Sequence, residues 1–221
     1  MKKLIILFLL ASTLTLWGCQ IKSGNNYADE FGNCLDKADK VVINELTSHF
    51  ELLLQDLYPN TEISFAYKKY LEAISKMEIQ PDFLLNEESL TLVKSIKKTK
   101  TFNKIWTKLN IETEQNENSK SEQIVIINKD KTENEPKFEP LTINPNGDFL
   151  NCLIINIGNK DFKEILEIKK KMPDISNGLV ASAMNNSLKK EDYESGLIRT
   201  FIAINLYYVY TLNLEKLEIN G

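Results

Sequence analysis

Apolar residues recur at spacings of three and four along most of this chain, and this period constrains the fold more than any other feature of the sequence. The longest stripe runs from Phe31 to Leu57, and such spacing places the apolar side chains on one face of an α-helix. Pro59 ends the predicted helix, because proline has no amide hydrogen for the helical hydrogen bond. A second stripe from Ile63 to Met77 follows after a short connection, so we expect an antiparallel helical hairpin.

Residues typical of helix starts mark the next helices. Asn86 is the expected N-cap of a third helix that extends through Ile96. Glu87 and Glu88 stand in its first turn, where the helix dipole favours acidic side chains. A fourth, short helix, or a continuation of the third, is predicted over residues 102–109.

The C-terminal part of the chain returns to the helical period. Gly158 and Pro173 end its first two predicted helices, and Asp174 is the expected cap of the next. The last helix is apolar nearly all round between Phe201 and Leu212, so we expect it at the centre of this half. The apolar positions of these helices are Phe149, Leu153 and Ile157; Phe162, Ile165 and Leu166; Leu179, Val180 and Ala183; and Tyr193, Leu197, Phe201, Ile204, Tyr208 and Leu212.

A polar insertion over residues 111–140 separates the two helical regions. Residues 112–123 have no apolar period and predict a flexible linker or surface loop. Two short apolar runs, 124–127 and 138–143, flank a charged turn. This arrangement slightly favours a short β-hairpin over irregular chain packed on the helices.

The predicted fold class is therefore mostly α, a helical bundle or array of about seven helices with a polar insertion and at most one short β-hairpin. The N-terminal helical region covers residues 29–110 and the C-terminal helical region covers 141–221. A chain of this length is able to bury a core without disulfide support.

The N-terminus has the pattern of an exported protein. Lys2 and Lys3 precede a short apolar run that begins at Leu4, as in a secretory signal peptide. The run is too short to span a bilayer comfortably, which takes about 20 apolar residues. The sequence Leu16-Trp17-Gly18-Cys19 follows, and it resembles the lipobox of bacterial lipoproteins, although Trp17 departs from the small residue usual there.

This resemblance implies a signal peptide over residues 1–18 and a lipidated tether over 19–28. Cys19 would carry a diacylglycerol thioether, and its new amine would be acylated by a fatty acid such as palmitate. Membrane lipid is thus an expected partner through Cys19. Gln20 is not the aspartate associated with inner-membrane retention, so the outer membrane of the cell envelope is favoured. The alternative is an ordinary signal peptide that is cut elsewhere.

Charge and composition argue against several functional classes. Loss of Lys2 and Lys3 with the signal changes the formal charge from −4 to −6, so nucleic acid is not an expected partner. Arg199 is the only arginine, which argues against bidentate clamps for phosphate or carboxylate groups. The glycines are scattered and form no phosphate-binding loop, so no cofactor is predicted.

The remaining two cysteines, Cys34 and Cys152, are an even pair in a compartment that permits disulfides. Both stand within apolar helical patterns, where a free cysteine behaves as a small hydrophobic residue. The sequence therefore favours two separate buried thiols and leaves a disulfide as the alternative.

No catalytic residue or metal site is predicted. His49 is the only histidine, and its place beside the first apolar stripe favours a structural role over that of a general base. Two polar sets loosely match the oxygen spacing of calcium ligands, yet both favour turns, the second with a helix cap. They are Asn128, Asp130, Thr132, Asn134 and Glu139, and Asn144, Asn146 and Asp148.

The densest acidic set is Glu191, Asp192 and Glu194, which the sequence places at the start of the last helix rather than in a hydrolase site. Aromatic residues that could form a sugar platform are more typical of a core at helical spacing. These are Tyr207, Tyr208 and Tyr210, and Trp106 with Phe102.

The leading functional hypothesis is a non-catalytic module of the cell envelope that binds another protein. One specific version is an immunity-type lipoprotein that blocks an incoming toxin. The alternatives are an envelope hydrolase that acts through carboxylates and a helical lipoprotein that binds a solute in an apolar cavity.

Overall fold

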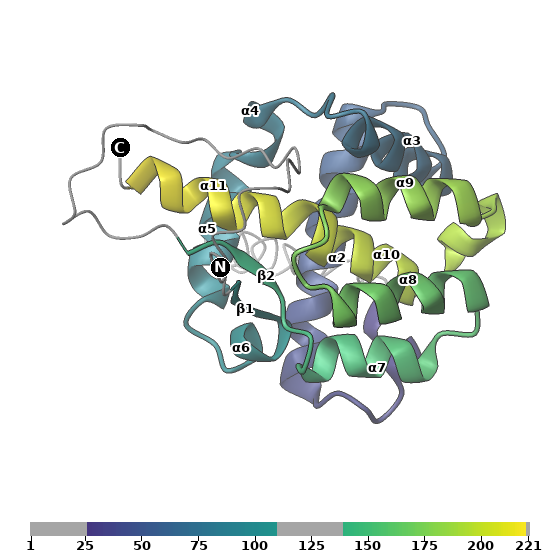
Figure 1. The fold of residues 1–221 in the computed structure, drawn as a ribbon. Helices are drawn as coiled ribbons and strands as arrows, with labels where there is room; N and C mark the ends of the chain where they lie inside the picture. The colour runs from purple at the N-terminus through teal and green to yellow at the C-terminus, as the bar shows by residue number, and fades with distance from the viewer. Residues whose placement is uncertain (1–25, 110–138, 220–221) are drawn as a thin grey trace, which may run out of the picture.

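A computed structural model describes residues 26–109 and 139–219, which are mostly helical as the sequence predicts (Figure 1). Cys19, the signal peptide, the apolar run 124–127 and the polar set from Asn128 to Asn134 lie outside the described residues. The elements are η1 (Tyr27–Phe31), α2 (Lys37–Leu57), α3 (Ile63–Ser75), α4 (Pro81–Leu84), α5 (Glu87–Ile96), α6 (Thr101–Ile105), β1 (Trp106–Lys108), β2 (Leu141–Ile143), α7 (Asp148–Asn156), α8 (Lys160–Lys171), α9 (Asn177–Ser187), η2 (Lys190–Glu194), α10 (Gly196–Phe201), η3 (Ile202–Tyr208) and α11 (Val209–Ile219).

The first long helix begins later than its apolar stripe. Phe31 belongs to the separate 3₁₀ turn η1, which ends at Gly32 with a φ of 55°. Asp36 then caps α2 by accepting a hydrogen bond from the amide of Asp39 at 2.9 Å. The prediction of one continuous helix from Phe31 is therefore wrong, because a turn places Phe31 on the same face. Most of the predicted stripe is buried, but Ala38 and Leu57 are exposed.

The predicted polar tether extends two residues too far. Tyr27 and Ala28 are buried in η1, which packs against α2 and α10. The Tyr27 hydroxyl donates to Glu51 at 2.6 Å, and the Ala28 amide donates to Asn44 Oδ1 at 2.8 Å. The folded body therefore starts at η1.

Part of the run 138–143 forms the strand β2, whereas the run 124–127, its partner in the predicted hairpin, lies outside the described residues. β2 pairs antiparallel with β1, so that Trp106 lies opposite Ile143 and Lys108 lies opposite Leu141. The sequence predicted a helix over residues 102–109, but α6 ends at Ile105 and Trp106 is extended, with φ −123° and ψ 152°. Tryptophan and threonine fit a pleated, half-buried surface well, which favours the strand over a further helical turn.

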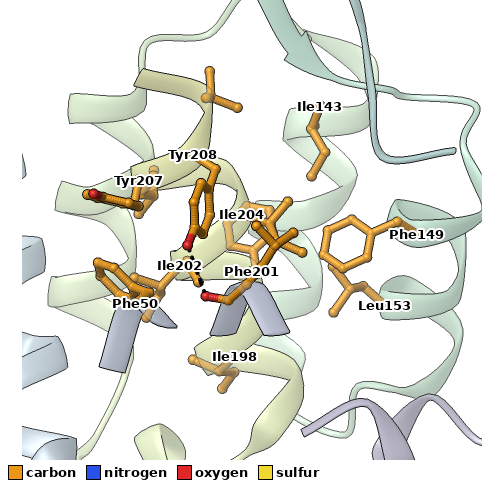
Figure 2. Close-up of a cluster of buried hydrophobic side chains, with 14 of the residues drawn as sticks. Phe50, Ile143, Phe149, Leu153, Ile198, Phe201, Ile202, Ile204, Tyr207 and Tyr208 are labelled. Carbon is orange, nitrogen blue, oxygen red and sulfur yellow. Dashed lines mark hydrogen bonds between the residues drawn. The ribbon is translucent and has the colours of Figure 1, made fainter. Parts of the chain in front are cut away.

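The last helix is central, as predicted, although it begins at Gly196 rather than at Tyr193. Every residue of its middle section, η3, is completely buried. Figure 2 shows the side chains around it, including Phe50 from α2 and Phe149 and Leu153 from α7. Tyr193 lies in the preceding 3₁₀ turn η2.

The middle section η3 is a π-helix, whose wider turn leaves backbone groups to be satisfied by neighbours. The Tyr70 hydroxyl of α3 donates to the Leu206 carbonyl at 2.8 Å. The side-chain Nδ2 of Asn177 in α9 donates to the Asn205 carbonyl at 3.0 Å. Residues from both helical regions thus stabilise the same irregular turn.

The two helical regions share one hydrophobic core. α3 of the first region packs closely against α9 of the second, and α5 packs against α11 (Figure 1). The buried apolar residues of both regions belong to a single cluster. The described residues on the two sides of the polar insertion therefore form one folded body with one core.

The predicted N-cap residue is correct at one helix start and wrong at two others. Asn86 caps α5 by accepting from the Ser89 amide at 2.9 Å, as predicted. Ser176 caps α9, in place of the predicted Asp174. Gly147 precedes α7 without a side-chain cap, so the predicted capping role of Asn146 or Asp148 is wrong.

Two glycines, Gly147 just before α7 and Gly158 just after it, give a matched test of packing. A Cβ on Gly147 would lie 2.1 Å from the Lys104 carbonyl oxygen, whereas a Cβ on Gly158 would meet nothing within 4 Å. We expect Gly147→Ala to lower the free energy of unfolding by about 1–3 kcal/mol, as overpacking does. Gly158→Ala is expected to raise it by about 0.4–1 kcal/mol. Urea unfolding of the oxidised protein measures both, and equal effects would contradict the described turn.

Candidate functional site

The aromatic residues considered as a sugar platform belong to the core. Tyr207 and Tyr208 are completely buried in η3, and Trp106 is 1% exposed. The Tyr207 hydroxyl is 2.6 Å from Ser89 Oγ and accepts from Asn86 Nδ2 at 2.8 Å. Tyr210 and Phe102 are partly buried and pack against the same core.

Arg199, the only arginine, is committed to a buried polar cluster. Its Nη1 lies 3.2 Å from Glu51 Oε1, its Nη2 lies 3.0 Å from Glu194, and its Nε donates to the Tyr193 carbonyl. The hydroxyls of Tyr27 and Tyr67 also donate to the Glu51 carboxylate, at 2.6 and 3.2 Å. The cluster ties η1, α2, α3 and α10 together, and it satisfies a buried carboxylate that would otherwise be costly.

The densest acidic set does not open the last helix as predicted, because these residues lie in η2. Asp192 accepts from Asn159 Nδ2 at 2.8 Å and from the Lys189 amide at 2.7 Å. Glu194 pairs with Arg199. Two of the three carboxylates therefore hold neighbouring elements together, which gives no support to the hydrolase hypothesis.

His49 lies between a buried tyrosine and a surface acid. Its Nδ1 is 2.8 Å from the Tyr208 hydroxyl, and its Nε2 is 3.7 Å from a carboxylate oxygen of Glu88. Burial lowers the pKa of His49 below its usual value of 6.5, and Glu88 opposes this in part. Burial also raises the pKa of the Tyr208 hydroxyl. The contacts connect α2 with η3 and α5, which fits the structural role that the sequence favours.

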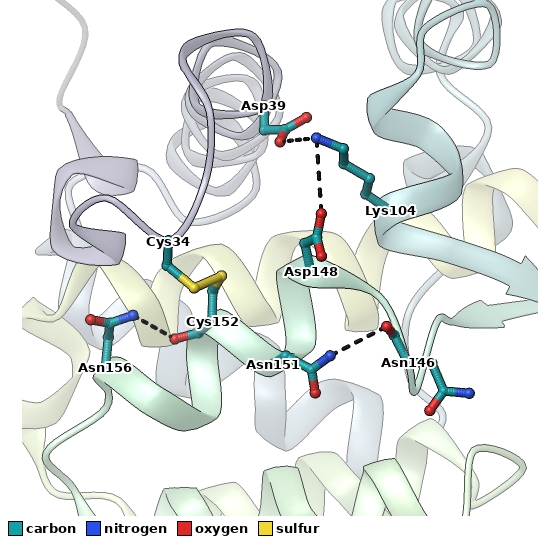
Figure 3. Close-up of a disulfide and its surroundings, with 8 residues drawn as sticks. All are labelled: Cys34, Asp39, Lys104, Asn146, Asp148, Asn151, Cys152 and Asn156. Atoms are coloured by element: carbon teal, nitrogen blue, oxygen red, sulfur yellow. Dashed lines mark hydrogen bonds and ion pairs between the residues drawn. A yellow bond between two sulfur atoms is a disulfide. The ribbon is translucent and has the colours of Figure 1, made fainter.

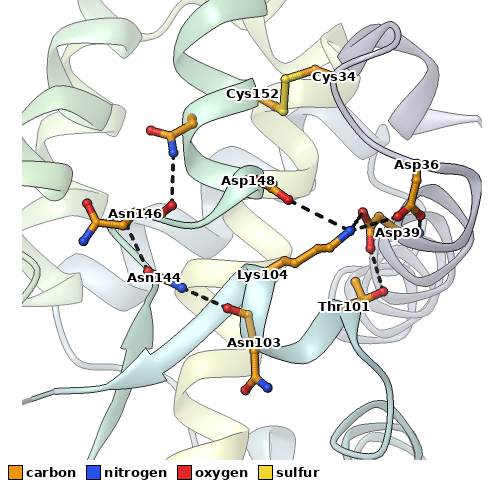
Figure 4. Close-up of polar contacts among 11 residues, drawn as sticks. Cys34, Asp36, Asp39, Thr101, Asn103, Lys104, Asn144, Asn146, Asp148 and Cys152 are labelled. Carbon is orange, nitrogen blue, oxygen red and sulfur yellow. Dashed lines mark hydrogen bonds and ion pairs between the residues drawn. A yellow bond between two sulfur atoms is a disulfide. The ribbon is translucent and has the colours of Figure 1, made fainter.

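The second polar set considered for calcium forms a turn. Asn144 Oδ1 accepts from the Asn146 amide at 3.0 Å, and Asn144 Nδ2 donates to the Asn103 carbonyl at 2.8 Å (Figure 4). Of the first set, Glu139 lies within the described residues, 2.5 Å from Lys108 Nζ. Within residues 26–109 and 139–219, no group of three or more acids, histidines or cysteines is arranged to hold a metal ion.

An ion-pair cluster lies beside this turn. Lys104 Nζ is 2.9 Å from Asp36, 2.7 Å from Asp39 and 3.9 Å from Asp148 (Figure 4). The hydrogen bond from Lys104 is the main reason why the pKa of Asp36 falls to about 2. The cluster joins the starts of α2 and α7 through α6, so its charges serve the fold.

Cys34 and Cys152 form a disulfide, whereas the sequence favoured two separate thiols (Figure 3). Their Cα atoms are 5.7 Å apart although 118 positions separate them in the sequence. Cys34 is exposed in the turn before α2 and not in a helix, and Cys152 is 2% exposed on α7. The bond fastens the segment that follows the tether to the second helical region.

An open hollow of about 540 Å³ lies where α2 turns into α3. Its charged groups already have partners, because Lys190 lies 2.8 Å from Glu62 and the Lys69 ammonium lies over the rings of Tyr58 and Phe65. This pairing leaves no charge oriented toward a ligand. Its lining residues are Asn60, Thr61, Glu62, Phe65, Lys69 and Lys190.

Two exposed apolar residues are Met77, just after α3, and Leu179, near the start of α9. We call the surface at these two helix ends the α3–α9 edge. Met77 is 73% exposed and Leu179 is 63% exposed. The Met77 amide donates to the Ile74 carbonyl at 3.1 Å, and a Cβ on Gly178 would lie 3.8 Å from the same oxygen. The end of α3 and the start of α9 therefore meet at this carbonyl. Neither residue was singled out as a site from the sequence, because Met77 and Leu179 also fit their apolar stripes.

Met77 combines exposure with an unfavourable backbone conformation. Its φ is 57°, at the position after the α3 C-cap where glycine is the usual residue. The Glu78 amide donates to the Ala73 carbonyl at 2.9 Å, which completes this type of helix end. A left-handed conformation costs a residue with a side chain about 1–2 kcal/mol, and an exposed methionine gains little packing in return.

No protein-family model matches the chain, and neither the curated proteins nor the solved structures compared with it include a match. Among the described helices, none combines the length and apolar character needed to cross a bilayer.

His49 predicts how stability depends on pH. Because its folded pKa is below the unfolded value, the unfolded chain takes up the proton first, and the free energy of unfolding falls as pH decreases from 6.5 toward the lowered pKa. His49→Gln should flatten this dependence, since it removes the only histidine. Glu88→Gln should steepen it, because the opposing acid is lost. Urea unfolding at several pH values between 7.5 and 5 measures the slopes, and an unchanged slope in His49→Gln would refute the assignment.

Proposed function

We propose that this chain is a lipid-anchored lipoprotein of the bacterial cell envelope that binds another protein without catalysis. The observation that carries the proposal is the sequence Leu16-Trp17-Gly18-Cys19 directly after a signal-like segment. Each buried methylene of an attached chain contributes about 0.8 kcal/mol, and two or more chains give stable anchoring. Gln20 favours the outer membrane.

The folded body is suited to attachment at this end. Seven positions separate Cys19 from Asn26, so an extended tether reaches at most about 25 Å. Directly after it, the Glu30 carboxylate accepts from Ser195 Oγ at 2.8 Å and from the Gly196 amide at 2.7 Å. The anchor therefore leads into a segment that is fixed to the start of α10.

The α3–α9 edge supports a binding role for the body. An exposed apolar residue that is held in a strained conformation contributes little to folding, and such strain is often retained for function. Methionine adapts its shape to apolar partner surfaces. The compact, acidic and helical body also suits the narrower immunity-type version, in which the partner is a toxin protein.

Anchoring is tested by Cys19→Ser in the full chain. We expect the unchanged protein to partition with membranes and to carry the mass of a diacylglyceryl group and a further acyl chain at Cys19. Cys19→Ser should lack this mass and leave the membrane fraction after export. Detergent-phase partitioning and intact mass spectrometry measure both properties. A Cys19→Ser protein that stays in the membrane fraction, together with an unmodified Cys19 in the natural chain, would refute the anchor.

Binding is tested at the α3–α9 edge, with Val41 on α2 as an apolar control of matching exposure at 65%. A photo-crosslinking residue at position 179 should give a discrete protein adduct in intact envelopes, and the same residue at 41 should not. Once the adduct identifies the partner, Leu179→Ser should weaken binding about tenfold, a loss of about 1.4 kcal/mol, and Val41→Ser should not change it.

Met77→Gly separates binding from folding. It should raise the free energy of unfolding by about 1 kcal/mol and still weaken partner binding. A variant that is more stable and binds equally well would contradict a role for this edge.

A further inference from the structure

The chain contains three cysteines, and the disulfide does not join the two that are close in sequence. Cys34 and Cys152 are 118 positions apart, whereas Cys19 is only 15 positions from Cys34. The closure of a flexible loop becomes rarer with roughly the three-halves power of its length. In the unfolded chain, Cys34 should therefore meet a free Cys19 about 20 times more often than it meets Cys152.

A free Cys19 thiol would also threaten the disulfide after folding. Cys34 is exposed, while Cys152 is 2% exposed beneath it on α7. The folded body begins at η1, Cys34 follows Asn26 by only eight positions, and the tether reaches about 25 Å from Asn26. A Cys19 thiolate that attacks Cys34 Sγ would form a Cys19–Cys34 bond and release Cys152 as a thiolate. This exchange conserves electrons and needs no added oxidant.

We propose that thioether formation at Cys19 has a second role, which is to remove the sulfur that competes for Cys34. The inference rests on the proposed lipidation, and it orders two reactions. Alkylation of the Cys19 sulfur by a diacylglyceryl donor comes first. A protein disulfide of the envelope then oxidises Cys34 and Cys152, takes up their two electrons and two protons, and is left as a dithiol.

The order of the two reactions matters because the Cys34–Cys152 disulfide holds the N-terminal segment of the folded body in place. The segment from Tyr27 to Cys34 carries the Tyr27 hydroxyl bond to Glu51 and the Glu30 contacts to α10. The bond to Cys152 on α7 fastens the other end of this segment (Figure 3). A Cys19–Cys34 bond would close a loop within the N-terminal segment alone and would leave this end unattached to α7.

The test compares three unlipidated mature chains that start at residue 19. The first has a free Cys19, and the second carries Cys19→Ser. The third has a free Cys19 and carries Cys152→Ser, so it serves as the reference for the mispaired product. Each is reduced, unfolded and refolded in a glutathione redox buffer. Samples are blocked with acid and mapped by non-reducing peptide mass spectrometry.

We expect the chain with free Cys19 to form the Cys19–Cys34 bond first, in about 20-fold excess over Cys34–Cys152 before folding, and to reach the native pair more slowly. Cys19→Ser should form only the native pair. Equal rates and yields of the native pair in these two chains would overturn the inference. This result does not depend on acylation in cells, so its failure is distinguishable from an unmodified Cys19, which would overturn the proposed anchor instead.

Discussion

The fold depends on the complete burial of the last helix between Ile202 and Tyr208. Neighbouring helices from both regions pack around this section, which removes its apolar surface from water (Figure 2). Each fully buried large apolar side chain contributes about 1.5–3 kcal/mol, so this one section is a major source of stability. Its π-helical backbone is tolerated because Tyr70 and Asn177 bind the carbonyls of Leu206 and Asn205.

Two residues of opposite charge, Glu51 and Arg199, are also buried in the interior. Glu51 is 6% exposed and would be costly alone, but Arg199, Tyr27 and Tyr67 satisfy its carboxylate. This arrangement uses the only arginine and the first buried tyrosine of the body. The consequence is that the N-terminal segment, where the proposed anchor enters, is fixed to the same interior that the last helix fills.

Sequence patterns predicted those parts of the fold that depend on local periodicity. The stripe up to Leu57, the cap at Asn86 and the central last helix follow from spacing and capping chemistry. Long-range pairing has no such local signal. Residue types near Trp106 allow helix or strand, and the choice depends on the distant β2. The pairing of Cys34 with Cys152 likewise depends on how the turn before α2 meets α7. The sequence favoured separate thiols because both cysteines stand within apolar helical patterns, a local signal that carries no information on this contact.

Some side chains of this protein have close partners within the fold, whereas others are exposed and contribute little to its stability. Lys104, Asp192 and Arg199 would attract attention as reactive groups, yet each has close partners on neighbouring elements. Met77 has the opposite character, because it is exposed and its conformation costs free energy. Stability alone would favour glycine at this position, since glycine adopts the left-handed conformation without strain. A binding role gives methionine a reason to be there, because its flexible apolar side chain can fit a partner surface that glycine could not contact.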